Sequence, residues 1–296
     1  MQTSADEGRE IKIFIAKDIL TLNLNNDSAE AVATQGSKIL NIGSQEELTS
    51  MYPNATLIST YNKATIVPGF IEHHIHPFLA AVIMNSEILA IEDWYLPSKT
   101  SKGVRDRLSY LSNLSEIEKN YPSNEPLISW GFHHYFHGRL SKSDLDKISS
   151  TRPIIVIHRS FHEFILNTPA MELLGISKNA DSNVGEDEHL ANFDDGHFSE
   201  RGAIIVLPKL MQVLAAPTKL MQGFQKTQEY LHRNGITVIG NPGSMYNKDL
   251  QAAKNLIFGN LDAPFESYFF PSALNISEQF ELNGVLDAAI EQTTWG

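Results

Sequence analysis

The chain has 296 residues, and 35 acidic against 23 basic side chains give a formal net charge of −12. A hydrophobic share of 42 % is typical of a globular protein and excludes a disordered chain, a coiled coil and a collagen-like fibre. The acidic balance argues against nucleic acid or an anionic membrane as a partner, and the lack of cysteine excludes disulfides and thiolate metal sites.

Short strands and turns are predicted for the first 65 residues. We expect strands over 11–15, 20–24, 31–34 and 38–42, and then a helix over 45–51 with Ser44 as its N-cap. This stretch is too short to bury a good core alone. Residues 1–65 are therefore interpreted as an N-terminal β-subdomain, sandwich-like and incomplete by itself.

From Thr65 onwards, strands alternate with helices. We expect strands over 65–71, 153–157, 236–239 and 266–270. Helices are expected over 78–91, 104–119, 143–148, 201–214, 218–233 and 248–258, and a further short helix begins at the N-cap Thr168 and ends at Gly175. Residues 177–200 are expected to form a polar surface excursion. This alternation predicts a parallel α/β architecture. Four or five strands are too few for a complete eight-stranded barrel, so residues 66–296 are interpreted as the first part of a TIM-type barrel with insertions.

The most informative segment is the histidine-rich end of the strand that begins at residue 65. Residues two apart on a strand share a face, so Glu72, His74 and His76 are expected to project together. Two imidazoles at this spacing suit a divalent metal such as zinc, nickel or iron. We expect both histidines to face the inside of a curved parallel sheet, with Glu72 buried on the same face as a ligand or as a group that orients one. The alternative is a polar loop with surface histidines.

Several short motifs carry a family resemblance. They are Pro68-Gly69-Phe70, Trp130-Gly131-Phe132, Ser143-Asp144-Leu145-Asp146, Arg152-Pro153, His162, Asn167-Thr168 and Gly235-Ile236-Thr237. Together with the histidine segment, they resemble the amidohydrolase superfamily in its YtcJ-like branch, amidohydrolase family 3, which includes N-substituted formamide deformylase.

The resemblance implies a metal-dependent hydrolase of non-peptide amide or formamide carbon–nitrogen bonds in a small-molecule substrate. A divalent metal, with zinc as the expected ion, lowers the pKa of a water molecule that attacks the carbonyl carbon. His74 and His76 match the two metal histidines of the family. Glu72 stands where the family usually has Asp, and Gly240-Asn241 stands where many relatives have His-Asp.

The remaining family ligands and the catalytic aspartate have no match in this chain, so its general base is unknown. We therefore expect a truncated hydrolase chain that does not turn over substrate by itself. The alternative is a non-catalytic partial barrel with an incomplete metal site. An exposed edge strand at 266–270 would favour association with another copy. A polar N-terminus and the lack of a long apolar run predict a cytoplasmic protein without a membrane partner.

Other polar residues are expected near the substrate. His158, Arg159 and His162 follow the strand over 153–157, where barrel enzymes place site residues, and His134 lies in an aromatic segment that could line a pocket or form a lid. Alternatively, His162 is structural and Arg159 pairs with Glu163 or another local acid. A separate metal site through His133 and His137 is a further alternative, although the flanking glycines favour a loop there.

Overall fold

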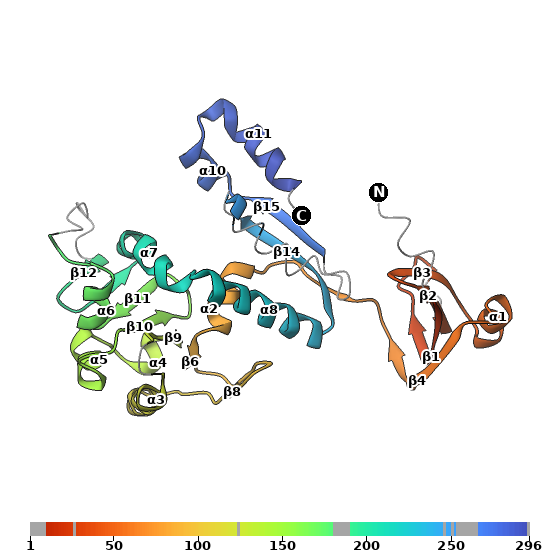
Figure 1. Ribbon diagram of the computed structural model, residues 1–296, viewed down its shortest axis with the longest axis horizontal. Coiled ribbons are helices and arrows are strands. Elements are labelled where there is room, and N and C mark those ends of the chain that lie inside the picture. Colours follow the sequence, from red (N-terminus) through yellow and green to blue (C-terminus); the bar gives the residue numbers. More distant parts are fainter. Residues whose placement is uncertain are drawn as a thin grey trace.

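The computed structural model describes residues 10–25, 28–122, 125–179, 190–244, 247–249, 252 and 266–294. Within these residues, the strands form four separate sheets, and no sheet closes into a barrel. The N-terminal sheet stands at one end of the long axis in Figure 1, and the largest sheet with its helices stands at the other. A three-stranded parallel sheet lies between them.

The N-terminal sheet has the strand order β3-β2-β1-β4. Its elements are β1 (Ile11–Leu20), β2 (Ser28–Gln35), β3 (Lys38–Gly43), α1 (Gln45–Met51) and β4 (Thr56–Ile66). Strand β1 pairs antiparallel with β2 and parallel with β4. The predicted N-cap Ser44 is confirmed, because its side chain accepts a hydrogen bond from Glu47 N–H and Glu47 reaches back to it.

Two expectations for this region are wrong. The described strands form one open sheet with α1 packed on it, where two packed sheets were expected. The first strand also continues to Leu20, so the separate strand expected over 20–24 does not form. Both neighbours support the longer strand, because β1 pairs with β2 as far as Leu20 and with β4 as far as Ile19.

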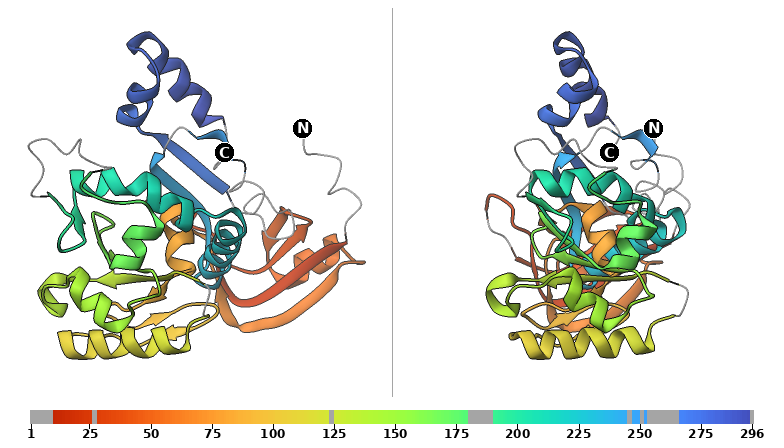
Figure 2. Two further views of the ribbon diagram at one scale, coloured as in Figure 1. Left: turned by 60° about the vertical axis from the view of Figure 1, so that its left-hand side comes forward. Right: turned by 90° about the vertical axis from the view of Figure 1, so that its left-hand side faces the viewer.

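The parallel sheet consists of β5 (Phe70–Glu72), β14 (Ile236–Ser244) and β15 (Glu266–Pro271), in the order β15-β14-β5. Helices α2 (Pro77–Met84) and α8 (Pro217–Arg233) pack against each other beside it. Their contact is so close that a Cβ at Gly223 would lie 2.3 Å from the carbonyl oxygen of Ala81. Strand β5 and its neighbour β14 are thus adjacent in space although a long insertion separates them in sequence (Figure 2).

That insertion builds the second α/β body, the described residues between 87 and 214, which we call the α/β unit. Its sheet has the order β12-β13-β11-β10-β9-β6. The strands are β6 (Glu87–Ile88), β9 (Leu127–Phe132), β10 (Ile154–His158), β11 (Glu163–Leu166), β12 (Ala191–Asn192) and β13 (His197–Ser199). The other elements are the hairpin β7 (Trp94–Tyr95) and β8 (Thr100–Ser101), and the helices α3 (Arg107–Asn120), α4 (His134–His137), α5 (Lys142–Ile148), α6 (Thr168–Leu173) and α7 (Arg201–Leu214).

Strand β10 forms the centre of this unit, and both of its faces are covered. Ile155 and Ile157 pack into one hydrophobic core with α6 and α7, while Ile154 and Val156 pack into another with α3 and α5. Because successive side chains point to opposite faces, only a doubly covered strand can bury a continuous apolar run. The prediction of such a strand over 153–157 is confirmed.

The prediction of a single barrel sheet is wrong for the described residues. The strands at 127–132 and 154–158 belong to the α/β unit and not to the sheet that contains β5. The expected helix over 78–91 ends at Met84, and residues 87–88 instead pair with β9. Likewise, β12 and β13 lie within the expected surface excursion and extend the sheet. In each case, pairing with a distant strand stabilises a conformation that local polarity does not predict.

At the end of the described chain, α10 (Ala273–Gln279) and α11 (Leu282–Thr293) follow β15. The strand expected over 266–270 is confirmed, and in the described residues it forms an edge of the parallel sheet. Most of the helix expected over 248–258 lies outside the described residues. Within the described residues, no helix combines the length and the apolar character needed to cross a membrane.

Candidate functional site

Two groups of histidines lie at the carboxyl ends of parallel strands. The first is the histidine pair, His74 and His76, which follows β5. Their ring centroids are 5.4 Å apart with the planes at 86°, so the imidazoles are close neighbours, as their spacing predicts. Glu72 is half-buried, where full burial was expected, and its Oε1 accepts a hydrogen bond of 3.0 Å from the backbone N–H of His74. The carboxylate therefore holds the backbone of one histidine of the pair.

Strand β14 supports the histidine pair from the side. The backbone N–H of Ile75 donates to the carbonyl of Gly240 at 3.0 Å, and a Cβ at Gly240 would lie 2.7 Å from the carbonyl oxygen of His73. The side chain of the next residue, Asn241, lies close enough to His76 to act on its pKa. Asn241 thus contacts the pair from the position where many relatives have the aspartate of His-Asp.

The surroundings of His76 favour the neutral imidazole that a metal requires. Partial burial is the main cause that lowers the pKa of His76, the nearby His74 lowers it further, and the side chain of Asn241 opposes the shift. Two imidazoles supply nitrogen donors that fit zinc or a similar ion. Among the described residues, the pair has no third His, Asp or Glu within the reach that a common ion would need.

The second group is the histidine triad, His133, His134 and His158. One potential ligand nitrogen from each lies within 4.8 Å of the others. The ring centroids are 5.2 Å apart for His133 and His158, 5.3 Å for His133 and His134, and 5.5 Å for His134 and His158. The triad comes from two strand ends, since β9 and β10 are parallel and Phe132 pairs with His158.

The alternative metal site through His133 and His137 does not form. His137 is buried, its Nε2 lies 2.8 Å from the carbonyl oxygen of Val104, and its Nδ1 accepts a hydrogen bond from the backbone N–H of His133. The residues 134–137 form a short helix where a loop was expected. Sequence reasoning missed the triad because it treated residues 130–137 as a loop; the apolar run from Leu127 was the available signal that a strand precedes them.

His158 is the most constrained member of the triad. It is 6 % exposed, and its Nδ1 lies 2.7 Å from the hydroxyl of Ser160. Its buried Nε2 has no hydrogen-bond partner in the described structure. Burial is the largest cause that lowers the pKa of His158 to about 4, so this imidazole is neutral at pH 7.

The other residues expected on the substrate side have partners of their own. Arg159 binds Glu92 with two hydrogen bonds of 3.0 and 3.3 Å, which agrees with the alternative that it pairs with a local acid. The Nδ1 of His162 lies 3.1 Å from a carboxylate oxygen of Glu200, and both side chains are exposed. His134 is exposed and belongs to the triad. None of these residues shares a sheet with β5, so the fold divides the expected site residues between two bodies.

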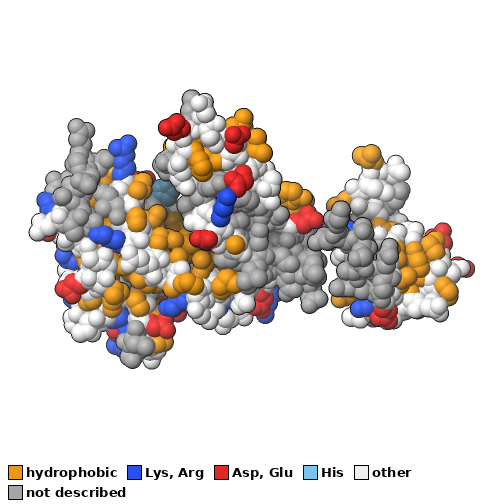
Figure 3. Space-filling model, turned by 45° about the horizontal axis from the view of Figure 1, so that its top comes forward, with side chains coloured by type: hydrophobic (Ala, Val, Ile, Leu, Met, Phe, Trp, Pro, Cys, Tyr) orange, Lys and Arg blue, Asp and Glu red, His pale blue; other side chains and the backbone are white. Residues whose placement is uncertain are grey.

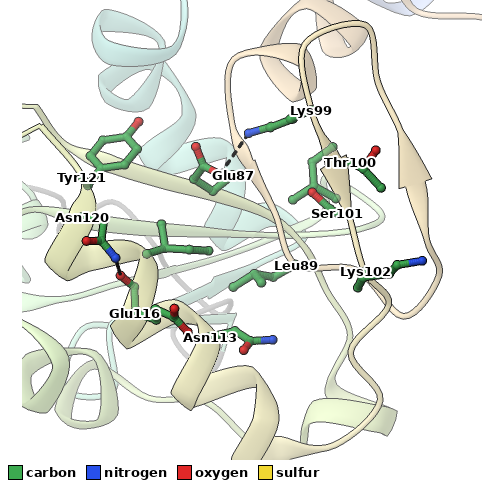
Figure 4. Close-up of a pocket in the computed structure, with 12 residues that line it drawn as sticks. Glu87, Leu89, Lys99, Thr100, Ser101, Lys102, Asn113, Glu116, Asn120 and Tyr121 are labelled. Carbon is green, nitrogen blue, oxygen red and sulfur yellow. Dashed lines mark hydrogen bonds and ion pairs between the residues drawn. The ribbon is translucent and has the colours of Figure 1, made fainter.

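A pocket of about 460 Å³ lies elsewhere in the α/β unit, between β6, the β7–β8 hairpin and α3 (Figure 4). Lys99 reaches across it to Glu87 with an ion pair of 3.0 Å. No histidine lines this pocket, so it is distinct from both histidine groups.

Comparison with known proteins defines the class. Residues 63–267 match the amidohydrolase family model Amidohydro_3. The chain therefore belongs to this amidohydrolase family, as the sequence motifs indicated.

Individual relatives agree with this assignment. The chain is 32 % identical to the putative amidohydrolase YtcJ of Bacillus subtilis and 26 % identical to N-substituted formamide deformylase of Arthrobacter pascens, over 54 % and 55 % of its length and 29 % of each relative. It is 23 % identical to the exoenzymes regulatory protein AepA of Pectobacterium carotovorum, over 88 % of its own length and 56 % of AepA.

The fold agrees as well. A metal-dependent hydrolase from Pyrococcus horikoshii superposes with a TM-score of 0.65 at 13 % identity, and the match covers 91 % of this chain and 50 % of that structure. The chain thus spans about half the length of the relatives that it matches most completely.

Proposed function

We propose that this protein carries the first two metal ligands of a metal-dependent hydrolase that acts on carbon–nitrogen bonds of the amide or formamide type. The observation that supports the proposal is the histidine pair at the end of β5, with imidazoles 5.4 Å apart, in a chain of the amidohydrolase family. One relative is an N-substituted formamide deformylase, which supports the proposed substrate class, a small molecule with an N-acyl or N-formyl group.

The residues of the pair have separate tasks in this proposal. His74 and His76 supply imidazole nitrogens to one divalent ion, with zinc as the proposed metal. When bound, such an ion polarises a carbonyl group and lowers the pKa of water. Glu72 fixes the backbone at His74 through its 3.0 Å hydrogen bond, and Asn241 orients His76 from β14. The base that accepts the proton from water is not assigned to a residue of this chain.

The test replaces the pair and a matched neighbour. His74→Ala with His76→Ala should weaken Zn²⁺ binding at this site by roughly 100-fold or more, since partners of a ligand alone account for about 10–100-fold. His73→Ala is the control, because His73 is an exposed histidine of the same segment that projects away from the pair in the predicted alternation. Isothermal titration calorimetry measures the affinities, and equal affinity for all variants would contradict the metal site.

A second function competes with catalysis, because the described residues place no third ligand beside the pair. In that case, the chain is a non-catalytic partial barrel that retains a weak metal site. Turnover of N-formyl and simple amide substrates separates the two functions. Turnover that disappears in His74→Ala supports the hydrolase, whereas metal binding without turnover supports the non-catalytic product.

A further inference from the structure

The histidine triad is built as a site in its own right. His158 ends β10, and His133 and His134 directly follow β9, so two adjacent parallel strands deliver three imidazoles to one edge of the α/β unit. All three ring-to-ring distances lie between 5.2 and 5.5 Å. Two separate backbone elements therefore bring the three rings together, with His134 stacked on His158 at an interplanar angle of 21°.

The buried member of the triad carries an unsatisfied nitrogen. A buried polar nitrogen without a partner costs about 1–3 kcal/mol in general, so such a group calls for a ligand. Only 6 % of the surface of His158 is exposed, and its Nε2 has no hydrogen-bond partner among the described residues. The backbone N–H of Ser160 donates to Nδ1 at 3.2 Å, so metal binding at Nε2 requires a change to the tautomer whose Nδ1 proton is donated to Ser160 Oγ, 2.7 Å away.

The exposed member of the triad, His134, lies close to a carboxylate. The Nδ1 of His134 lies 3.8 Å from Oε1 of Glu163, and the other oxygen of Glu163 lies 3.0 Å from Nε2 of His197. A carboxylate at the far nitrogen of an imidazole is the arrangement that orients metal-binding histidines and raises their basicity. With its Nδ1 facing Glu163, His134 has its Nε2 free for the ion.

The surrounding charges are compatible with a cation. Arg159 is the nearby positive charge, and its ion pair with Glu92 neutralises it. Glu163 then contributes a negative charge beside the three rings. The amino acids around the triad thus do not repel a divalent ion.

We propose that His133, His134 and His158 bind one divalent transition metal of the zinc class, at a site separate from the histidine pair. Three imidazoles with a fourth position open to solvent form the ligand set of zinc sites that also hold water or a substrate oxygen. The open side is that of His134, whose side chain is 61 % exposed.

Binding requires a small rearrangement. Two nitrogens on one tetrahedral zinc are about 3.3 Å apart, given Zn–N distances of about 2.0–2.1 Å. The triad nitrogens lie within 4.8 Å of one another, and rotation of the exposed His134 would bring them to the shorter distance. The Nδ1 of His133 accepts a 3.3 Å hydrogen bond from Tyr135 N–H at the start of α4, and metal binding replaces this weak bond. The ion would then connect α4 to β10.

The experiment uses the full chain with His74→Ala and His76→Ala, which removes the pair and leaves the triad, and Zn²⁺ alone as the probe. Calorimetry should show one Zn²⁺ per chain, and long-range ¹H–¹⁵N spectra should show a shift of the His158 Nε2 resonance on binding. Addition of His134→Gln should weaken this binding by roughly 100-fold. His162→Gln is the matched control, since His162 is an equally exposed histidine of the same unit outside the triad.

Each outcome decides between the sites. If the pair-deleted chain binds no Zn²⁺, or if His134→Gln and His162→Gln have the same affinity, the triad site is refuted, while the hydrolase proposal for the pair stands. If His134→Gln alone removes all binding from the wild-type chain, the triad stands and the metal role of the pair fails. His134 is exposed, so circular dichroism should show an unchanged fold and exclude unfolding as the cause.

Discussion

The two histidine groups occupy equivalent places on two very different sheets. Every residue of β10 is buried, whereas no residue of β5 is fully buried. His158 at the end of β10 is 6 % exposed, while both histidines after β5 are exposed. The same side chain at the end of a parallel strand is thus rigidly enclosed in one region and open in the other.

The difference follows from what covers each strand. Helices and hydrophobic cores lie on both faces of β10, but the parallel sheet leaves large apolar side chains exposed. In the strands of the parallel sheet, four large apolar side chains have at least half of their surface exposed: Phe70, Ile71, Tyr268 and Phe270. Hydrophobic side chains are also visible around the C-terminal helices in Figure 3. A site is therefore preorganised where the chain itself supplies the cover, and less so where the sheet face is open.

The largest expected effect contrasts one phenylalanine from each sheet. Phe164 on β11 is 2 % exposed and Phe70 on β5 is 57 % exposed. Phe164→Ala should lower the free energy of unfolding of the α/β unit by about 3–5 kcal/mol, because it leaves a cavity in a closed core. Phe70→Ala should cost less than about 1 kcal/mol, because little of its surface leaves water on folding. Urea unfolding followed by peptide-level hydrogen exchange measures both, and equal losses would contradict the contrast.

A smaller effect tests how the parallel sheet is held by its helices. Gly223→Ala places a methyl group against the backbone of α2, so we expect a loss of about 1–3 kcal/mol from overpacking. Gly284→Ala in α11 is the matched control, because its Cβ would meet only Phe280 side-chain atoms at 3.5 Å or more. That variant should gain up to about 1 kcal/mol from helix propensity. Thermal unfolding compares them, and a stabilised Gly223→Ala would refute the close helix contact.

The smallest expected effect concerns an exposed edge of the α/β unit, where burial contributes least to stability. The side chain of Lys102, as the largest cause, and the backbone N–H of Gly103 lower the pKa of Asp93 from 3.8 to about 2. Because the folded pKa lies below the unfolded one, this contribution to stability is present above pH 3.8 and is lost as the pH falls through about 2.

Carboxyl ¹³C shifts measured by NMR report this titration directly. Lys102→Met should raise the pKa of Asp93, but not fully to 3.8, since Gly103 N–H still donates at 2.8 Å. An unchanged pKa in Lys102→Met would show that the ion pair of 2.7 Å does not hold the carboxylate in solution.

Local signals in the sequence were sufficient where the relevant partners are neighbours in the chain. The N-cap Ser44 forms as predicted, and the capping box of Ser141 with Asp144 is equally local, because each bond joins residues three apart. The N-cap of α6 is different. Thr168 was expected there, but Asn167 is the cap, and the same side chain also accepts from Ile154 N–H at 2.8 Å. Its position depends on the neighbouring strand β10, which local reasoning did not include.

The sequence by itself determined the family, the histidine pair and the doubly covered strand β10, because motif spacing and an unbroken apolar run carry that information. Only the tertiary structure decided which strands share a sheet, and this divided the expected barrel strands between two bodies. It also decided the triad, since His134 and His158 are 24 positions apart and meet only through the parallel register of Phe132 with His158. Because β9 and β10 are parallel, no tight turn fixes their register, and packing between segments that are distant in the sequence decides it.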